Sequence, residues 1–153
     1  MKAYGETKKA SEFRADANSV REALLRAVRS VHPGAKFEIP VSQLEACVTF
    51  LGNFQSIFTT NYDLLLYWVI LQRPKVYSDG FGYGTNVEGF RTFSASAPCN
   101  IYFLHGALHL FLGKTRETKK RVVTGDTIID DIESTIKKSG QLPLFVSEGQ
   151  WTQ

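Results

Sequence analysis

The stretch that decides the fold is Ile57-Phe58-Thr59-Thr60-Asn61-Tyr62-Asp63. Its β-branched and aromatic residues are typical of a buried strand, and the strand ends at an amide and a carboxylate. Residues 64–71 follow directly and are apolar enough to form a helix packed on a sheet. In open α/β sheets, ligands bind beyond the carboxyl ends of the strands. We therefore expect Asn61 and Asp63 to lie at a ligand site.

A second segment, Asn100-Ile101-Tyr102-Phe103-Leu104-His105-Gly106, repeats this arrangement. It is a hydrophobic strand that ends in a titratable side chain and is followed by a glycine. If the two strands are neighbours in one parallel sheet, Asn61 and His105 converge on one cleft. Histidine titrates near neutral pH, which makes His105 the natural proton acceptor of such a site.

Thr59-Thr60-Asn61-Tyr62-Asp63 followed by Leu104-His105-Gly106 resembles the sirtuin-like superfamily. In particular, it is similar to the bacterial proteins of that group that read T-T-N-Y-D and then L-H-G, several of which destroy NAD in antiphage defence. The wider stretch from Phe50 to Phe111 is similar to an uncharacterised bacterial branch. The resemblance implies an α/β fold that is partly Rossmann-like, with a mostly parallel sheet and helices on both faces.

The resemblance also implies a reaction and the residues that carry it. NAD would be the substrate, and the enzyme, if active, would be an NAD glycohydrolase that cleaves the bond between nicotinamide and ribose. Such cleavage passes through an oxocarbenium-like state, as in glycoside hydrolysis. Asn61 and His105 take the positions of the family's catalytic pair. The residues that would contact NAD are Thr59, Thr60, Asp63 and Gly106.

Each of these residues also has a simpler structural explanation that the sequence leaves open. His105 could be a strand-end histidine bonded to the backbone. Asp63 could serve only as the acid at the start of the following helix, where the helix dipole favours a negative charge. Asn61 could be a helix N-cap. His109 lies four residues after His105, so the two would form a metal-binding pair if this segment were helical.

The remaining chain predicts an alternation of helices and strands. We interpret residues 1–17 as a tail or arm and residues 18–153 as a single domain. A helix is predicted from Asn18 or Ser19 to His32, which would cap its end, and a second from Ser42, where Glu45 completes a capping box. Further along, the pattern predicts a long loop over residues 73–99, strands at 101–104, 108–112, 121–123 and 142–146, and a helix from Asp126 to Gly140.

Composition excludes several classes of function. The net charge is +3, from 18 basic and 15 acidic residues, and the basic residues are scattered, so no nucleic-acid partner is expected. The densest basic segment, Lys114–Arg121, favours a solvated loop or hairpin. Cys47 and Cys99 are the only cysteines, too few for the four-cysteine zinc site of sirtuin deacylases, so no zinc is expected. We expect both to be buried free thiols in a cytoplasmic protein without a membrane segment.

The resemblance is incomplete at both ends. The family's first strand and glycine-rich turn, which approach the NAD pyrophosphate, have no counterpart before Asn61, and its C-terminal part is also missing. The chain is therefore expected to be an internal piece of the family domain, completed by a homo-oligomer or a full-length relative. The alternative function is a non-enzymatic interaction or regulatory module that associates with such a relative.

Overall fold

The computed structural model describes residues 10–82, 89–113, 115–122 and 128–145. Its helices and strands, in chain order, are α1 (Ala10–Val31), a short 3-10 turn η1 (Lys36–Glu38), α2 (Val41–Leu51), β1 (Ile57–Thr59), α3 (Leu65–Ile70), β2 (Phe90–Thr92), β3 (Ile101–Phe103), β4 (Gly106–Leu112), β5 (Thr118–Arg121), α4 (Ile128–Ser139) and β6 (Pro143–Phe145).

The strands form two sheets, and most of their pairs are antiparallel. β1 and β3 make a two-stranded parallel sheet, and the other sheet has the order β2-β5-β4-β6 with antiparallel pairs throughout. The prediction of a mostly parallel, Rossmann-like sheet is therefore wrong. The strand after β3 cannot run parallel to it because the connection is too short: only Leu104 and His105 separate β3 from β4. A parallel crossover needs a dozen or more residues, and a turn this short cannot provide one.

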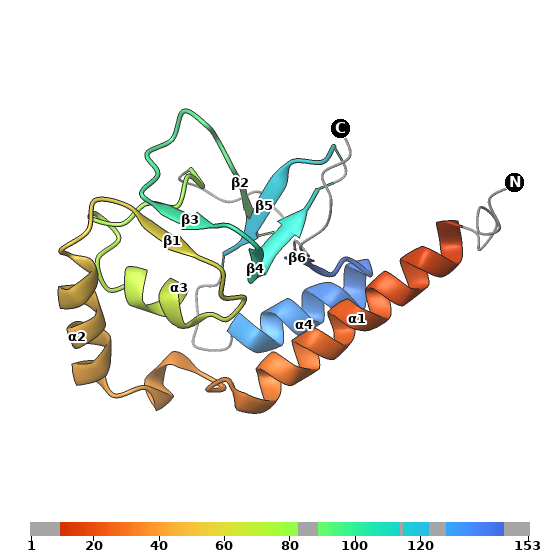
Figure 1. The fold of residues 1–153 in the computed structure, drawn as a ribbon, viewed down its shortest axis with the longest axis horizontal. Helices are drawn as coiled ribbons and strands as arrows, with labels where there is room; N and C mark the ends of the chain where they lie inside the picture. Colours follow the sequence, from red (N-terminus) through yellow and green to blue (C-terminus); the bar gives the residue numbers. More distant parts are fainter. Residues whose placement is uncertain (1–9, 83–88, 114, 123–127, 146–153) are drawn as a thin grey trace, which may run out of the picture.

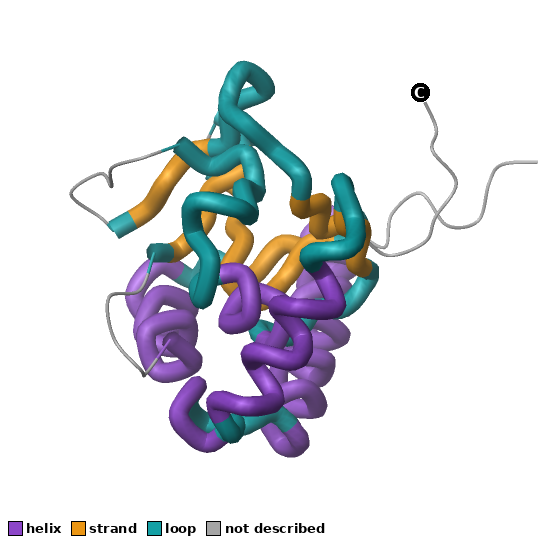
Figure 2. The backbone as a smooth tube through the Cα atoms, turned by 90° about the vertical axis from the view of Figure 1, so that its left-hand side faces the viewer, coloured by secondary structure: helices purple, strands orange, loops and turns teal. Residues whose placement is uncertain are grey.

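The helices gather on one side of the strands, whereas the sequence predicted helices on both faces. Figure 1 shows α1 and α4 side by side below the sheets, and Figure 2 shows the strands and loops together on the opposite side. Arg29 of α1 links the two helices, since its guanidinium contacts the carboxylates of Asp130, at 3.8 Å, and Glu133 of α4. Among the described helices, none combines the length and apolarity that crossing a bilayer requires.

The core lies between α3 and the sheets. Four consecutive residues of α3, from Tyr67 to Ile70, are buried, whereas Leu65 at its start is exposed. Leu64, Ile101 and Phe111 are almost completely removed from solvent. The main cluster of buried residues comprises Leu64, Tyr67, Trp68, Ile70, Tyr77, Phe90, Ile101, Leu108, Phe111, Ile129, Ile132 and Phe145.

Several boundaries differ from the predictions. α1 begins at Ala10, eight residues before the predicted start at Asn18. α2 begins at Val41 with Pro40 as its N-cap and without a side-chain cap, so the predicted capping box is wrong. Pro40 has φ of −53° and ψ of 133°, so its backbone is extended and the helical conformation begins only at Val41.

Two further features were not predicted by the sequence pattern. The expected loop over 73–99 contains β2, which pairs with β5, and residues 83–88 of that loop lie outside the described residues. Cys47 is exposed and Cys99 is half-buried, so the expectation of two buried thiols is wrong. Cys47 lies on α2, whose buried face contains Leu44 but does not extend to the thiol.

For the segment 114–121 the sequence predicted a solvated loop or hairpin; its described residues belong to a hairpin, but one of the lysines is buried. β4 and β5 pair as a hairpin, and the Lys120 side chain on β5 points inward and forms an ion pair with Asp79. Burial lowers the pKa of Lys120, and the nearby Asp79 carboxylate opposes that shift. Burial, with Asp79 second, raises the pKa of Tyr67 to about 12, so this phenol stays protonated.

His109 is a buried neutral histidine in the centre of β4. Its side chain is 0% exposed, its ring stacks on Tyr67 with centroids 4.4 Å apart, and Phe103 meets it edge-on. Neither ring nitrogen has a hydrogen-bond partner in the described part of the chain. Burial, with Lys120 second, lowers the pKa of His109 to about 3. Because β4 is a strand, His105 and His109 do not form the helical metal pair, and the described residues contain no cluster of three metal-binding side chains.

The depressed pKa of His109 predicts acid sensitivity. The unfolded chain binds a proton near the ordinary histidine pKa, whereas the folded chain does not until about pH 3. This contribution to stability is therefore full above about pH 6.5 and is lost as the pH falls, by about 1.4 kcal/mol per unit between about pH 6 and about pH 4. Urea unfolding at several pH values should show this slope in the wild type, with a shallower slope in His109→Phe. Equal slopes in the two proteins would refute it.

Candidate functional site

The ends of β1 and β3 lie next to each other. Ile57 pairs with Ile101 and Thr59 with Phe103 in parallel register. The pairing continues one residue past β3, because the Leu104 N–H donates to the carbonyl of Thr59, the last residue of β1, at 2.9 Å. Asn61 and His105 each lie two residues beyond the end of their strand, Asn61 after β1 and His105 after β3.

The two side chains differ in their surroundings. Asn61 is exposed, and its backbone N–H donates to the Thr59 hydroxyl at 3.1 Å. His105 is half-buried, and its ring centroid lies 6.2 Å from that of Tyr62. The imidazole makes no hydrogen bond within the described part of the chain. Both groups are therefore accessible to a ligand from solvent.

A cavity of about 330 Å³ opens beside Asn61. It is lined by Val28, Val31, His32, Pro33, Thr60, Asn61, Tyr62, Asp63 and Leu65. The end of α1 thus forms one wall and the segment after β1 the other. His105 does not line this cavity. Its ring lies near Tyr62, which does line the cavity, with ring centroids 6.2 Å apart. The structure brings the two strand ends together, with the cavity on the Asn61 side.

The remaining residues named from sequence have clear local roles. The Asp63 carboxylate accepts a hydrogen bond from the Leu65 N–H at 2.9 Å, which satisfies a free N–H at the start of α3. Thr60 is exposed and lines the cavity, and the Thr59 hydroxyl accepts a hydrogen bond from the Asn61 N–H. Gly106 is buried with φ of +86°, and a Cβ there would collide with the Leu144 carbonyl oxygen. Only glycine fits this corner without strain.

His32 is a site residue that the sequence reasoning missed. Its Nε2 accepts a hydrogen bond from the Leu64 N–H at 3.0 Å, and its Nδ1 lies 2.7 Å from the Pro33 carbonyl oxygen. This pattern requires a neutral ring with the proton on Nδ1. The ring also packs edge-on against Trp68, with centroids 4.8 Å apart. His32 therefore joins the end of α1 to the start of α3. It also lies directly after the last residue of α1, where its N–H donates to the Val28 carbonyl at 2.9 Å, in agreement with the predicted helix end.

A domain of unknown function, DUF4917, matches residues 2–153. The chain belongs to the DUF4917 family. No curated protein and no solved structure matches the sequence. The DUF4917 match includes both strand ends and the α1 wall of the cavity. The description of the family names no activity.

His32→Ala and His105→Ala are expected to differ in how much they lower stability. His32→Ala leaves the Leu64 N–H without a partner inside the protein, which costs about 1–3 kcal/mol. His105→Ala removes a half-buried ring with no hydrogen bond in the described chain, so the change should stay within about 0.5 kcal/mol. Urea unfolding at neutral pH measures both. A larger loss in His105→Ala than in His32→Ala would contradict this assignment.

Proposed function

We propose that this DUF4917 protein binds NAD at the ends of β1 and β3 and hydrolyses the bond between nicotinamide and ribose. The proposal follows the sirtuin-like motifs. The observation that supports it best is the parallel pairing of β1 and β3, because Asn61 and His105 follow the carboxyl ends of these two neighbouring strands. A hydrolytic site needs a group that holds the sugar and a group that takes a proton, and these two side chains supply both.

The chemistry assigns a distinct role to each residue. The glycosidic C–N bond breaks and its electron pair leaves with neutral nicotinamide, while positive charge develops on the ribose. Water then attacks the anomeric carbon, and His105 accepts the proton that this water loses. Asn61 is uncharged, so it can hydrogen-bond a ribose hydroxyl or the attacking water at little desolvation cost. The products are nicotinamide, ADP-ribose and a proton.

The cavity beside Asn61 suits one part of the substrate. Its volume of about 330 Å³ is at the lower end of the range for ligand pockets, so it would accept the nicotinamide and its ribose better than a whole dinucleotide. Val28, Val31 and Leu65 offer apolar surface to a flat ring. The Asp63 carboxylate lies in the same wall and can accept a hydrogen bond from the carboxamide.

Release of nicotinamide from NAD tests the proposal. The purified wild-type protein should release nicotinamide, and Asn61→Ala and His105→Ala should each lower the rate by about 100-fold or more. Asn53→Ala is the matched control, because Asn53 is an exposed asparagine that precedes β1 instead of following it. Chromatography of the products measures the rate.

Two outcomes would contradict the proposal. Absence of nicotinamide release from the wild type would remove the enzymatic function. Activity that persists in both Asn61→Ala and His105→Ala would mean that the reaction occurs elsewhere. Because His105→Ala is expected to leave stability unchanged, a loss of activity in that variant does not reflect unfolding.

A second candidate function is association with another copy of this chain or with a longer relative. One face of the β1–β3 sheet is aromatic and exposed: the Phe58 side chain is 62% exposed and stacks on Tyr102, with ring centroids 4.8 Å apart. Leu104 beside them is also exposed. Exposed apolar surface of this kind is typical of protein–protein contact sites.

Light scattering tests this association. The wild type should form a dimer or larger oligomer at micromolar concentration, and Phe58→Ser should shift it to monomer because the polar side chain weakens apolar contact. Phe13→Ser is the control, since Phe13 is similarly exposed, at 60%, but lies on α1. A monomeric wild type, or equal effects of the two substitutions, would refute the assignment.

A further inference from the structure

A small cavity lies between α3 and β5, beside the buried Lys120. Its volume is about 160 Å³, and four of the residues that line it are buried: Tyr67, Asp79, Phe81 and Lys120. It opens to solvent at a rim of exposed residues, Leu71, Pro74 and Pro98. Among the described residues, the lining of this cavity and that of the cavity beside Asn61 have none in common.

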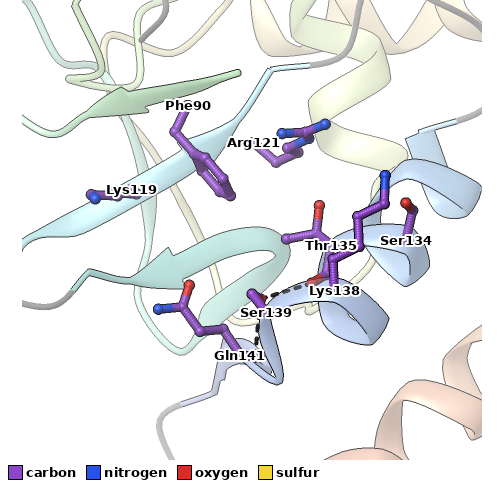
Figure 3. A pocket seen from close by; sticks show the side chains of 8 residues that line it. All are labelled: Phe90, Lys119, Arg121, Ser134, Thr135, Lys138, Ser139 and Gln141. Carbon is purple, nitrogen blue, oxygen red and sulfur yellow. Dashed lines mark hydrogen bonds between the residues drawn. The ribbon is translucent and has the colours of Figure 1, made fainter. Parts of the chain in front are cut away.

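Two adjacent lysines of β5 point to opposite faces of the sheet, as neighbouring side chains of a strand do. Lys119 and Arg121 face α4, and Figure 3 shows them among the residues that line a separate cavity there. Lys120 faces α3 instead, and its ammonium lies 5.8 Å from the ring centroid of Tyr67 and 5.1 Å from that of Phe81. Because both rings and Lys120 line the small cavity, the amine lies at its wall.

A carboxylate that can accept a proton contacts this amine. Asp79 Oδ2 forms an ion pair with the Lys120 ammonium, and each side chain is 7% exposed. Asp79 Oδ1 accepts a hydrogen bond from the Phe81 N–H at 3.3 Å, which fixes the carboxylate in place. Burial lowers the pKa of Lys120, whereas Asp79 opposes this shift. The pair therefore contains an amine that can act as a nucleophile and a base that can take its proton.

The hydroxyl of Tyr67 is the third polar group at this cavity. Tyr67 is 3% exposed. No hydrogen bond to its hydroxyl occurs within the described part of the chain, although a buried tyrosine usually bonds its hydroxyl. Burial, with Asp79 second, raises the pKa of Tyr67 to about 12, so the phenol keeps its proton. It can therefore donate a hydrogen bond to an oxygen atom of a ligand.

A structural role of the ion pair explains only part of this arrangement. Lys120 and Asp79 join β5 to the segment between α3 and β2, and a buried ion pair can serve packing alone. That role requires neither a cavity beside the amine nor a buried hydroxyl that lacks a partner in the described chain. Both features are expected if a small molecule with an oxygen atom occupies the cavity.

We propose that Lys120 binds a small aldehyde or ketone in this cavity as a Schiff base. Asp79 takes a proton from the ammonium, and the nitrogen electron pair attacks the carbonyl carbon, while the Tyr67 hydroxyl donates to the carbonyl oxygen. The C–O bond then breaks and a C=N bond forms. The oxygen leaves as water with two of the three ammonium protons, and the protonated imine keeps the third, so nothing is oxidised or reduced.

The size of the cavity limits the ligand. Pockets for drug-sized molecules have volumes of about 300–1,000 Å³, so a cavity of about 160 Å³ suits only a short carbonyl compound. The inference does not depend on the proposed NAD hydrolysis, because the two cavities use different residues.

Reductive trapping of the wild-type protein tests the inference. Propanal with cyanoborohydride at neutral pH converts a Schiff base into a stable propyl-lysine, which tandem mass spectrometry of the peptides locates. Lys120 should be modified at least about tenfold faster than Lys119, because the cavity holds the carbonyl beside the amine. Lys119 is the matched control, since it is adjacent on β5 and its side chain is more exposed, at 23%. In urea the two lysines should react at equal rates.

A variant tests the part played by Tyr67. Tyr67→Phe keeps the aromatic ring and removes only the hydroxyl, so the thermal midpoint of unfolding should stay unchanged. It should trap propanal at Lys120 about fivefold more slowly, because one hydrogen bond to the carbonyl oxygen is lost. Lys120→Met is less informative, because it leaves Asp79 as a buried charge without its partner and is strongly destabilising.

Three outcomes would overturn the inference. They are faster modification of Lys119 than of Lys120, equal rates at both lysines in the folded protein, and an unchanged rate in Tyr67→Phe. The NAD experiment is independent of these outcomes. Asn61→Ala should trap propanal at Lys120 as the wild type does, and Tyr67→Phe should release nicotinamide at the wild-type rate if the chain hydrolyses NAD.

Discussion

The rest of the structure depends on the corner at Gly106. Two residues separate β3 from β4, and the chain makes this turn with φ of +86° at Gly106, directly against the Leu144 carbonyl oxygen of β6. An L side chain at this position would be strained and would clash. The corner therefore joins the parallel pair to the antiparallel sheet and leaves His105 at the point where they meet. It also lets β4 pair with β6 close to the turn, where Gly106 lies opposite Phe145.

The position of the candidate site follows from this corner and from one hydrogen bond across the chain. β1 joins the corner through its parallel pairing with β3, so the residues after both strands emerge at the same edge. α3 starts immediately after that edge, and the His32 imidazole accepts the Leu64 N–H and ties α1 to it. Since Leu64 is fully buried, this N–H needs a protein partner, and the bond therefore holds the cavity wall as well as the core.

The sequence predicted the local elements well and the pairing of strands poorly. β1, β3 and α4 have clear hydrophobic patterns, and their positions agree with the predictions within a few residues. The sheet type could not be predicted in the same way, because it depends on how tightly the chain turns at Gly106, and glycine is compatible with many turns. The burial of Lys120 could not be predicted from the sequence either, since its partner Asp79 lies 41 residues away in an irregular segment. His32 was missed for the same reason, as Leu64 is 32 residues distant.

The mostly antiparallel fold leaves the geometric premise of the site unchanged. A ligand site at strand ends needs only two neighbouring parallel strands, because their carboxyl ends then lie at one edge. β1 and β3 supply this minimal pair, and the antiparallel sheet beyond Gly106 does not alter their register. A complete doubly wound sheet would add further strand ends and a phosphate-binding turn, but it is not required to bring two strand ends to one edge. The placement of Asn61 and His105 after neighbouring strand ends therefore depends on one strand pair and can be tested separately from the ancestry of the whole domain.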